Sequence, residues 1–446
     1  MPVTTPLTVP LTVITAVYVA VFVYYLQATI IVEPFWDMYS HVLRYLRFRE
    51  DAAWWAYLWE PHVQHRHVWM RLLTAFDVEA FSGVAYPFIV TAAACLLLTA
   101  WLLGREVRTI VPRELRVAVG CLVVMLLLTS VAAVDCAIPI NGIYPQAVFF
   151  TVLALVLFDG AGESGAADQR PRQWRRAAAV LAAVAAAFAN AATLALWPIL
   201  IWMAWRVRAG RLWIAGLIVS ATAFIGLYVY GLPLAPQVGL GSGDGAGFLT
   251  GDHLLRMADY LVTYLGLPWT RAAALSVPGR GVGAALLIAG VFAVLRHGFI
   301  RPPGGRLERL AVGLIMFSMA SALLAAIGRA DVDPDVIVPV RYSLFVAPLH
   351  IGLLWLACPY LSRQWATQER RPLLQALMVG AGVLLLVQQV AAGEAAVTTT
   401  DAMRATIRRF IAGETDPAMT RVIFDNLEQA RQSWETIRDA GVYVGR

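Results

Sequence analysis

Long apolar runs separated by short arginine-rich stretches dominate the sequence. A run of about 18 or more apolar residues is long enough to cross a bilayer as a helix. Eleven segments follow or approach this pattern: about 8–31, 84–103, 117–135, 144–158, 177–190, 192–205, 212–230, 281–296, 309–327, 341–358 and 373–392. The fifth and sixth are short and are joined through ANAATLALWP. The pattern predicts an all-α polytopic membrane protein with about eleven transmembrane helices.

The connections between these runs carry arginine in an alternating pattern. Three or four arginines lie in each of GREVRTIVPRELR, DQRPRQWRR, RVRAGR, RHGFIRPPGGRLER and SRQWATQERR, and these fall on every second connection. Cytoplasmic loops of membrane proteins carry an excess of basic residues. We therefore expect a multi-pass protein of the cytoplasmic (inner) membrane, with its N-terminus inside and its C-terminus outside.

Four larger segments then fall on the outer face. They are the first outer loop (32–83), a glycine-rich loop (231–280), the short stretch GRADVDPDVIVPVRY, and the tail (393–446) that follows the transmembrane domain (1–392). The tail has helical periodicity broken at GETDP, which predicts two or three small amphipathic helices. So short a segment buries little core alone, and we expect it to pack on the membrane domain.

Composition agrees with a lipid environment. The 446 residues are 59% hydrophobic and 14% charged, with a mean hydropathy of +0.67, whereas soluble domains are about 25% charged. The net charge of +6 comes from arginines in short loops, as membrane topology requires. This distribution does not resemble a nucleic-acid-binding surface, so membrane lipid is the expected partner and nucleic acid is not. The four cysteines lack metal-ligand spacing and are expected to be buried thiols.

The first outer loop concentrates the polar chemistry of the chain. Residues 38–50 form an amphipathic pattern, and Pro61 suits the first turn of a second helix, so two helices should lie along the outer membrane surface. In the second helix, His62, His65 and Arg66 would share a face. Asp37 follows the first span by about six residues, within roughly 10 Å of the membrane surface.

Two other interpretations of this loop stay open. Its arginines could contact lipid phosphates while its histidines pack or cap helices. Alternatively, His62, His65 and His67, or Asp37 with His62 and His65, could ligate a divalent metal such as zinc, although His67 would point elsewhere on an ideal helix. A connection between two spans needs only a few residues, however, so a loop of this length and composition favours a function.

The arrangement of an N-terminal span, a long outer loop and an early aspartate resembles the membrane-embedded GT-C glycosyltransferases. This group includes protein mannosyltransferases, oligosaccharyltransferases and aminoarabinose transferases. Four segments are similar to uncharacterised bacterial proteins of this type: HVQHRHVWMRLLTAFD, NAATLALWPILI, DYLVTYLGLP and AAIGRADVDPDVIVPVRYSLFVAPL. The likeness touches nearly the whole chain, in short patches.

The resemblance implies a donor sugar carried on a polyprenyl phosphate, and a role for Asp37 as the base or as a metal-binding aspartate. Many GT-C members carry two adjacent acids here, whereas this chain has Asp37 alone, with Glu33 four residues earlier. A lipid-phosphate donor needs cations beside the leaving phosphate, and Arg329, Arg341 and the neighbouring Tyr342 lie at the outer ends of predicted spans. His62, His65 and Arg66 could orient the sugar or the phosphate.

The expected function is therefore a glycosyltransferase that moves a sugar from a polyprenyl-phosphate donor to an acceptor on the outer face. One alternative is a degenerate, non-catalytic GT-C-like scaffold, which the missing second acid favours. Another is a lipid or polysaccharide transporter, which usually places ionisable groups inside its spans. The main polar residues of these span interiors are Asn190, His350 and the pair Gln388 and Gln389, which counts against ion-coupled transport.

Overall fold

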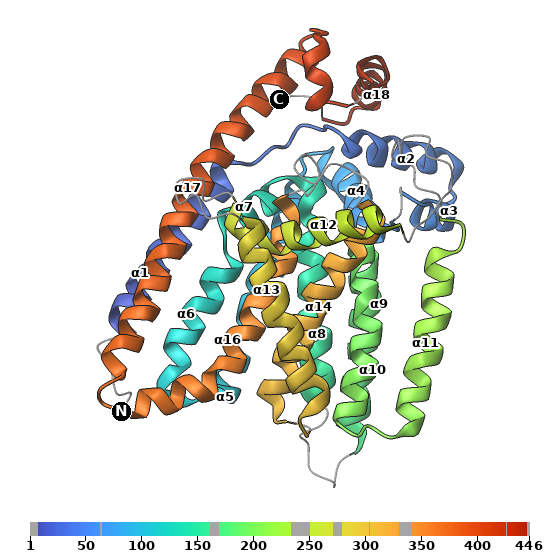
Figure 1. The fold of residues 1–446 in the computed structure, drawn as a ribbon. Helices are drawn as coiled ribbons and strands as arrows, with labels where there is room; N and C mark the ends of the chain where they lie inside the picture. The colour runs from blue at the N-terminus through green and yellow to red at the C-terminus, as the bar shows by residue number, and fades with distance from the viewer. Residues whose placement is uncertain are drawn as a thin grey trace.

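The chain folds as a bundle of long helices with shorter helices across one end (Figure 1). The computed structural model describes residues 8–62, 65–160, 169–232, 250–270, 279–302, 304–329, 340–424 and 426–443. Within these ranges all regular secondary structure is helical, and no strand is present. The predicted all-α class is confirmed.

Eight helical segments among the described residues are long and apolar enough to cross a bilayer. They are α1 (Thr8–Ala28), α5 (Tyr86–Ile110), η2 and α8 (Pro139–Gly160), α11 (Arg211–Val229), α13 and the π-helical η5 (Gly279–Ile300), α14 (Arg306–Arg329), α16 (Ser343–Ala366) and α17 (Arg371–Ile411). A bent pair, in which η1 and α6 (Arg113–Leu127) meet α7 (Ser130–Ala137) at an angle of 47°, is long and apolar enough only when its two parts are taken together as one broken span. By the length and composition of its helices, the chain is a multi-pass membrane protein.

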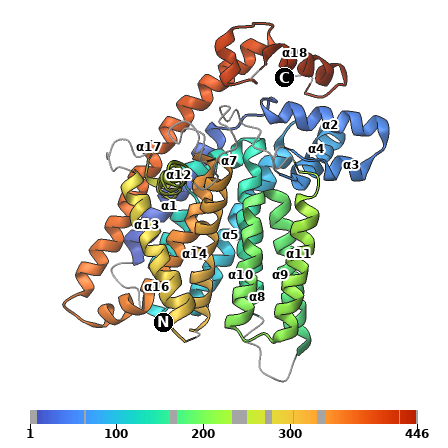
Figure 2. The ribbon, with the colours of Figure 1, turned by 45° about the vertical axis from the view of Figure 1, so that its right-hand side comes forward.

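The two remaining predicted spans are weaker. Residues 177–190 belong to α9 (Gln169–Ala189), whose first turns are rich in arginine. Residues 192–205 form η3 (Ala191–Ala195) and α10 (Leu196–Arg206), which together are shorter than a typical span. Both α9 and α10 run alongside the long helices (Figures 1 and 2). The count of eleven spans stays a prediction.

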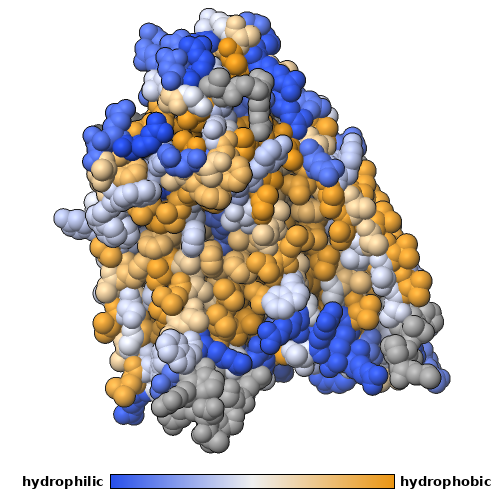
Figure 3. Space-filling view, turned by 180° about the vertical axis from the view of Figure 1, so that it is seen from behind, coloured by the Kyte–Doolittle hydropathy of each residue, from blue (hydrophilic) through white to orange (hydrophobic). Residues whose placement is uncertain are grey.

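The arginine-rich connections gather at the end of the bundle where α1 begins (Figure 1). Buried ion pairs hold the helices together there: Arg306 reaches Glu106 of α5 at 2.9 Å, and Arg309 reaches Asp159 of α8 at 2.6 Å. Figure 3 shows a broad apolar band between two polar ends on the rear face of the molecule. This distribution is the one that a bilayer imposes on a protein that crosses it.

The first outer loop forms three helices at the opposite end, not the predicted two. These are α2 (Asp37–Asp51), α3 (Trp54–Trp59) and α4 (Val68–Phe81). The prediction that a helix begins at Pro61 is wrong, because His62 and His65 pair through their backbones as an isolated antiparallel bridge. The histidines of this stretch therefore do not follow helical spacing.

The predicted glycine-rich outer loop contains a helix of its own, α12 (Gly251–Thr270), which lies across the same end (Figure 1). Residues 233–249 and 271–278 of that prediction lie outside the described residues, as does most of GRADVDPDVIVPVRY. Glycines allow α12 and α13 to touch through their backbones. A Cβ added at Gly266 would lie 2.0 Å from the Gly279 carbonyl oxygen, and one at Gly283 would lie 1.8 Å from that of Val262.

The tail begins differently from the prediction, but its helices are interrupted at GETDP as predicted. The helix α17 does not end near residue 392 but continues to Ile411, so that its full length from Arg371 is 41 residues. At about 1.5 Å per residue it is roughly twice as long as the hydrocarbon core is thick, so its second half projects beyond the bundle. The chain then turns at GETDP into η7 (Pro417–Arg421) and α18 (Leu427–Asp439).

The tail packs on the first outer loop. A hydrophobic cluster joins Ile407, Ile423 and Trp434 of the tail with Phe35 and Tyr39 near the start of α2. The Trp36 backbone N–H donates to the Ile423 carbonyl at 2.8 Å. Arg404 of α17 donates hydrogen bonds to the carbonyls of Ala28 and Ile30 at the end of α1. The tail is thus part of the structure that covers this end of the bundle.

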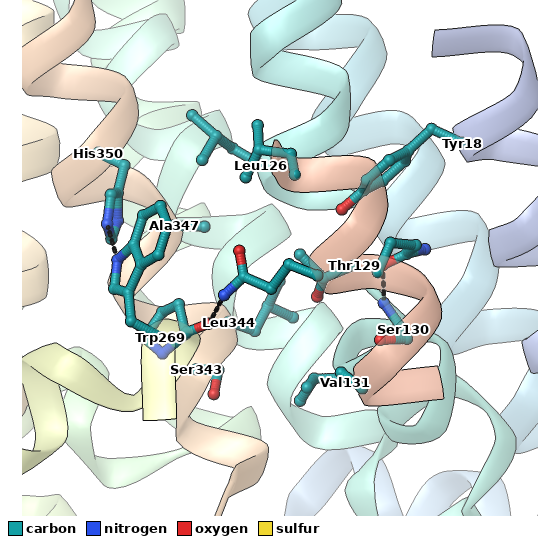
Figure 4. A pocket seen from close by; sticks show the side chains of 15 residues that line it. Tyr18, Leu126, Thr129, Ser130, Val131, Trp269, Ser343, Leu344, Ala347 and His350 are labelled. Carbon is teal, nitrogen blue, oxygen red and sulfur yellow. Dashed lines mark hydrogen bonds between the residues drawn. The ribbon is translucent and has the colours of Figure 1, made fainter. Parts of the chain in front are cut away.

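The break between α6 and α7 is capped by side chains. Gln389 of α17 accepts from the Ser130 backbone N–H and donates to the Leu128 carbonyl at 3.1 Å. Thr129 caps α7 by accepting from the Ala132 N–H at 3.1 Å. Figure 4 shows the pocket beside this break, where the Trp269 indole also donates to His350 at 3.0 Å. Three of the polar residues expected inside the spans, His350, Gln388 and Gln389, meet around this one pocket.

Candidate functional site

Two cavities lie at the covered end of the bundle. The larger cavity has a volume of about 450 Å³ and is lined by His65, Asn190, Tyr264, Arg329, Tyr342 and Phe345 together with apolar side chains. The smaller cavity has a volume of about 220 Å³ and lies between α7, η2 and α17. Its polar lining includes Asp135, Asn141 and Arg341. The site is therefore divided into two compartments.

The 3-10 turn η6 (Val340–Tyr342) separates the two compartments. Residues that follow each other in such a turn point about a third of a turn apart. Arg341 accordingly lines the smaller cavity and Tyr342 the larger one. Arg341 and the loop histidine His65 therefore line different cavities.

Aromatic rings fix the position of Arg329 in the larger cavity. Its guanidinium lies 5.6 Å from the centre of the Tyr342 ring, which stacks on Tyr264 of α12 at 5.4 Å. Tyr144 of α8 meets the other side of Tyr342 edge-on at 5.6 Å. The remaining walls are apolar and include Pro198, Ile225 and Leu324. The cavity thus combines one arginine with a largely apolar lining.

Arg341 and Asp135 both line the smaller cavity. The Arg341 Nε and the Asp135 Oδ2 are both buried, and neither has a hydrogen-bond partner among the described residues. Arg341 interacts electrostatically with Tyr144, Asp135 and Asp37. Buried polar atoms that lack partners are costly, at about 1–3 kcal/mol each. The smaller cavity is therefore a polar compartment suited to a water molecule or a small ligand group.

Asp37 is the first residue of α2, and its side chain is 44% exposed. Its Oδ2 lies 3.4 Å from the His62 Nε2. Burial alone would raise the pKa of the Asp37 carboxyl, but the His62 imidazole and the charge of Arg341 outweigh it and lower that pKa. Asp37 is consequently ionised at neutral pH. Glu33 lies in the irregular link between α1 and α2 and is half-buried.

The loop histidines are buried together behind Asp37. His41 of α2, His62 of the bridge and His67 before α4 have ring centres 4.7 to 5.7 Å apart, and His65 stacks on His67 at 5.0 Å. Burial lowers the pKa of His41 and of His67 well below the ordinary value. Burial and the charge of Arg329 lower the pKa of His65 to about 3. At neutral pH these three rings are therefore uncharged.

His65 and Arg66 have different surroundings from His62. The His65 Nδ1 accepts a hydrogen bond from the Ala191 backbone N–H at 3.3 Å, and the ring borders the larger cavity. Arg66 donates to the backbone carbonyls of Trp59, Tyr228 and Tyr230, and its guanidinium lies 4.5 Å from the centre of the Trp59 ring. Arg66 thus holds the loop against the end of α11 and is not part of either cavity.

The sequence interpretation missed two residues of this site. Asp135 lay at the end of a predicted span, where nothing distinguished it from an exposed boundary residue. His41 was counted among the loop histidines without a role. It follows Asp37 by four residues, which places both on one face of α2. The four-residue spacing between Asp37 and His41 could have indicated that the two side chains lie together.

The arrangement places an ionised carboxylate, two arginines and uncharged imidazoles at one end of a membrane bundle. Such groups can accept a proton, hold a phosphate or ligate a metal. In comparisons with known proteins, no protein-family model matches the chain, and no curated protein or solved structure matches it. The likeness to GT-C glycosyltransferases therefore stays a resemblance at the level of sequence.

Proposed function

We propose that the protein is a glycosyltransferase that takes a sugar from a polyprenyl-phosphate donor and passes it to an acceptor at the outer membrane surface. The observation that supports the proposal best is the larger cavity. It combines Arg329 and the Tyr342 hydroxyl with apolar walls at the end of the membrane bundle. A lipid phosphate has matching chemistry, because its anionic head needs a cation while its isoprenoid chain stays in an apolar environment.

The reaction needs a group that takes a proton from the acceptor hydroxyl. As the acceptor oxygen attacks the anomeric carbon, the bond from that carbon to the phosphate oxygen breaks, and polyprenyl phosphate leaves with the electron pair. In the proposal Asp37 accepts the hydroxyl proton, for which its ionised state is suitable. Arg329 neutralises the charge that develops on the leaving phosphate.

Arg341 takes a different role from the phosphate-binding one expected from sequence. It lies in the smaller cavity, where its charge acts on Asp37 and Asp135. We assign Arg341 to holding Asp37 in its ionised state, and Arg329 to the donor phosphate. His65, which borders the larger cavity, is then the loop histidine placed to contact the sugar.

The experiment uses the full chain purified in detergent, with polyprenyl-phosphate-linked hexoses and pentoses as donors. Turnover is followed as release of polyprenyl phosphate, and binding of polyprenyl phosphate alone is measured separately. We expect Asp37→Asn to lower turnover at least about hundredfold while binding is kept. Arg329→Gln should weaken binding about 10- to 100-fold.

Matched controls are available at the same end of the molecule. Asp401→Asn and Arg409→Gln change exposed groups on α17 and should leave turnover and binding unchanged. A wild-type protein that binds polyprenyl phosphate without releasing it from any donor would support the non-catalytic scaffold instead. An Asp37→Asn variant with full turnover would refute the assignment of the base.

A transporter is the second candidate, because two features of the structure favour it. Asp135 is a buried carboxyl on the second half of a broken span, and ionisable groups inside membrane spans commonly mark transport pathways. Broken helices also line many transporter sites. Transport predicts that labelled lipid moves across the membrane of proteoliposomes with its glycosidic bond intact, and that Asp135→Asn stops the movement.

A further inference from the structure

The histidines of the first outer loop converge on one point. His41 comes from α2, whereas His62 and His67 come from the irregular stretch that precedes α4. Each offers one ring nitrogen, and these three nitrogens lie within 4.8 Å of one another. The rings are almost fully buried, with 0% of His41 and 6% of each of the other two exposed.

The ring nitrogens of this cluster lack partners. Both nitrogens of His41, both of His67 and the Nε2 of His62 are buried without a hydrogen-bond partner among the described residues. A neutral imidazole carries one N–H donor and one acceptor nitrogen, and burial normally requires a partner for each. His41 and His67 lack partners for both ring nitrogens, and the His62 Nε2 has only the Asp37 Oδ2 nearby, at 3.4 Å, so a ligand held between the three rings and Asp37 would supply what these nitrogens lack.

We propose that His41, His62 and His67 form a binding site for a divalent transition-metal ion of the zinc type, with Asp37 as the fourth ligand. Imidazole nitrogen is a preferred ligand of zinc, and three histidines leave one tetrahedral position for a carboxylate or water. The proposal goes beyond the proposed function and does not depend on it, because metal binding needs no glycosyl donor. An ion bound through the Asp37 Oδ2, which lies beside His62, would leave the Oδ1 of the same carboxylate for the acceptor proton.

The distances suit a small cation. Zinc–nitrogen bonds of about 2.0–2.1 Å place neighbouring ligands of a tetrahedral site about 3.3 Å apart. The Asp37 Oδ2 and the His62 Nε2 are already 3.4 Å apart. The histidine nitrogens, at up to 4.8 Å, require each ring to approach the ion by less than about 1 Å.

The surrounding charges set the strength of the site. Arg71 and Arg44 place positive charge near His41 and oppose a cation. Arg44 is itself offset by Glu60 at 3.6 Å, and Arg71 donates to the Leu58 carbonyl at 2.9 Å. Asp37 supplies the negative charge at the ion, so its removal should weaken binding without abolishing it.

His65 provides an internal control. Its ring stacks on His67, but its Nδ1 already accepts a hydrogen bond from the Ala191 N–H, and it does not belong to the three-histidine set. The proposed set differs from the zinc triad considered from sequence, His62, His65 and His67, in having His41 in place of His65. His297, at the opposite end of the bundle, is a second control, since it pairs with Glu308.

The test is a zinc titration of the full chain, purified in detergent and stripped with a chelator, followed by elemental analysis. We expect one zinc ion per chain. Separate His41→Asn, His62→Asn and His67→Asn changes should each weaken binding at least about hundredfold, and Asp37→Asn about 10- to 100-fold. His65→Asn and His297→Asn should bind as the wild type does.

A cobalt titration of the wild type makes the test independent of how the variants fold. Tetrahedral coordination gives visible cobalt absorption that an octahedral, non-specific site does not. Wild-type protein that takes up neither ion would overturn the proposal. The proposal would also be overturned if His65→Asn weakened zinc binding as much as His67→Asn does. A third contrary result is a wild-type melting temperature that rises with inorganic phosphate but not with zinc, which would indicate an anion site around Arg71.

Discussion

Replacing Gln389 by leucine tests how the broken span is stabilised. The chain breaks between α6 and α7 inside the bundle, and the Gln389 amide bonds to two backbone groups on either side of the break, the Leu128 carbonyl and the Ser130 N–H. Gln389 is 2% exposed, so water does not replace these bonds. Leucine has a similar volume, and the change therefore removes hydrogen bonds with little change in packing.

The size of the effect follows from the two groups left behind. A buried backbone group without a partner costs about 1–3 kcal/mol. Hydrogen bonds between membrane helices average only about 0.6 kcal/mol, because the separated helices find other partners. At a break in the helix no such partner is at hand, so we expect a loss of about 2–4 kcal/mol. With the per-residue unfolding entropy of soluble domains, a chain of 446 residues loses about 1 °C of melting temperature per kcal/mol.

The assay is thermal unfolding in detergent, followed by tryptophan fluorescence. We expect Gln389→Leu to melt about 2–4 °C below the wild type. The neighbouring Gln388 donates one hydrogen bond, to the Pro268 carbonyl, so Gln388→Leu should show about half the effect. A Gln389→Leu protein that melts within about 1 °C of the wild type would refute the reasoning, as would a larger loss in Gln388→Leu.

Three further predictions concern topology and the ends of the bundle. Reporter fusions at residues 165 and 300 should report the cytoplasm and one at residue 440 the opposite side; a cytoplasmic reading at 440 would contradict the arginine pattern. Arg404→Met removes the hydrogen bonds at the end of α1 and should lower the melting temperature by about 1–2 °C, whereas an unchanged value would show that the tail does not hold α1. Arg309→Gln removes the 2.6 Å contact with the buried Asp159 and should lower the free energy of unfolding by about 2–4 kcal/mol, more than Arg363→Gln at an exposed site.

The helical class and the long spans could be predicted because they depend on local sequence. An apolar run of sufficient length must satisfy its backbone internally, and a helix does so without reference to the rest of the chain. The end of α17 before GETDP was predictable for the same reason, since glycine and proline stop a helix locally. The continuation of α17 past residue 392 was not, because the packing of Ile407 and Phe410 against the first outer loop stabilises it.

The course of residues 60–67 depends on distant contacts. Proline at the first turn made a helix from Pro61 a reasonable prediction. In the structure, Arg66 is held by carbonyls at the end of α11 some 160 residues later, and His62 and His65 pair through their backbones instead of starting a helix. No pattern within the loop reports a partner so far away in the sequence. Because the His62–His65 bridge replaces the expected helix, helical spacing does not bring His62 and His67 beside His41, and the candidate metal site could not be predicted from spacing alone.

Arg329 and Arg341 lie in different cavities and therefore have different electrostatic surroundings. Arg329 faces an apolar cavity without a carboxylate among its described lining residues, so its charge is free for a ligand anion. Arg341 faces Asp135 and acts on Asp37, so its charge is already shared between carboxyl groups. The His62 imidazole and the Arg341 charge both favour the ionised form of Asp37, which is the state that both a proton acceptor and a metal ligand require.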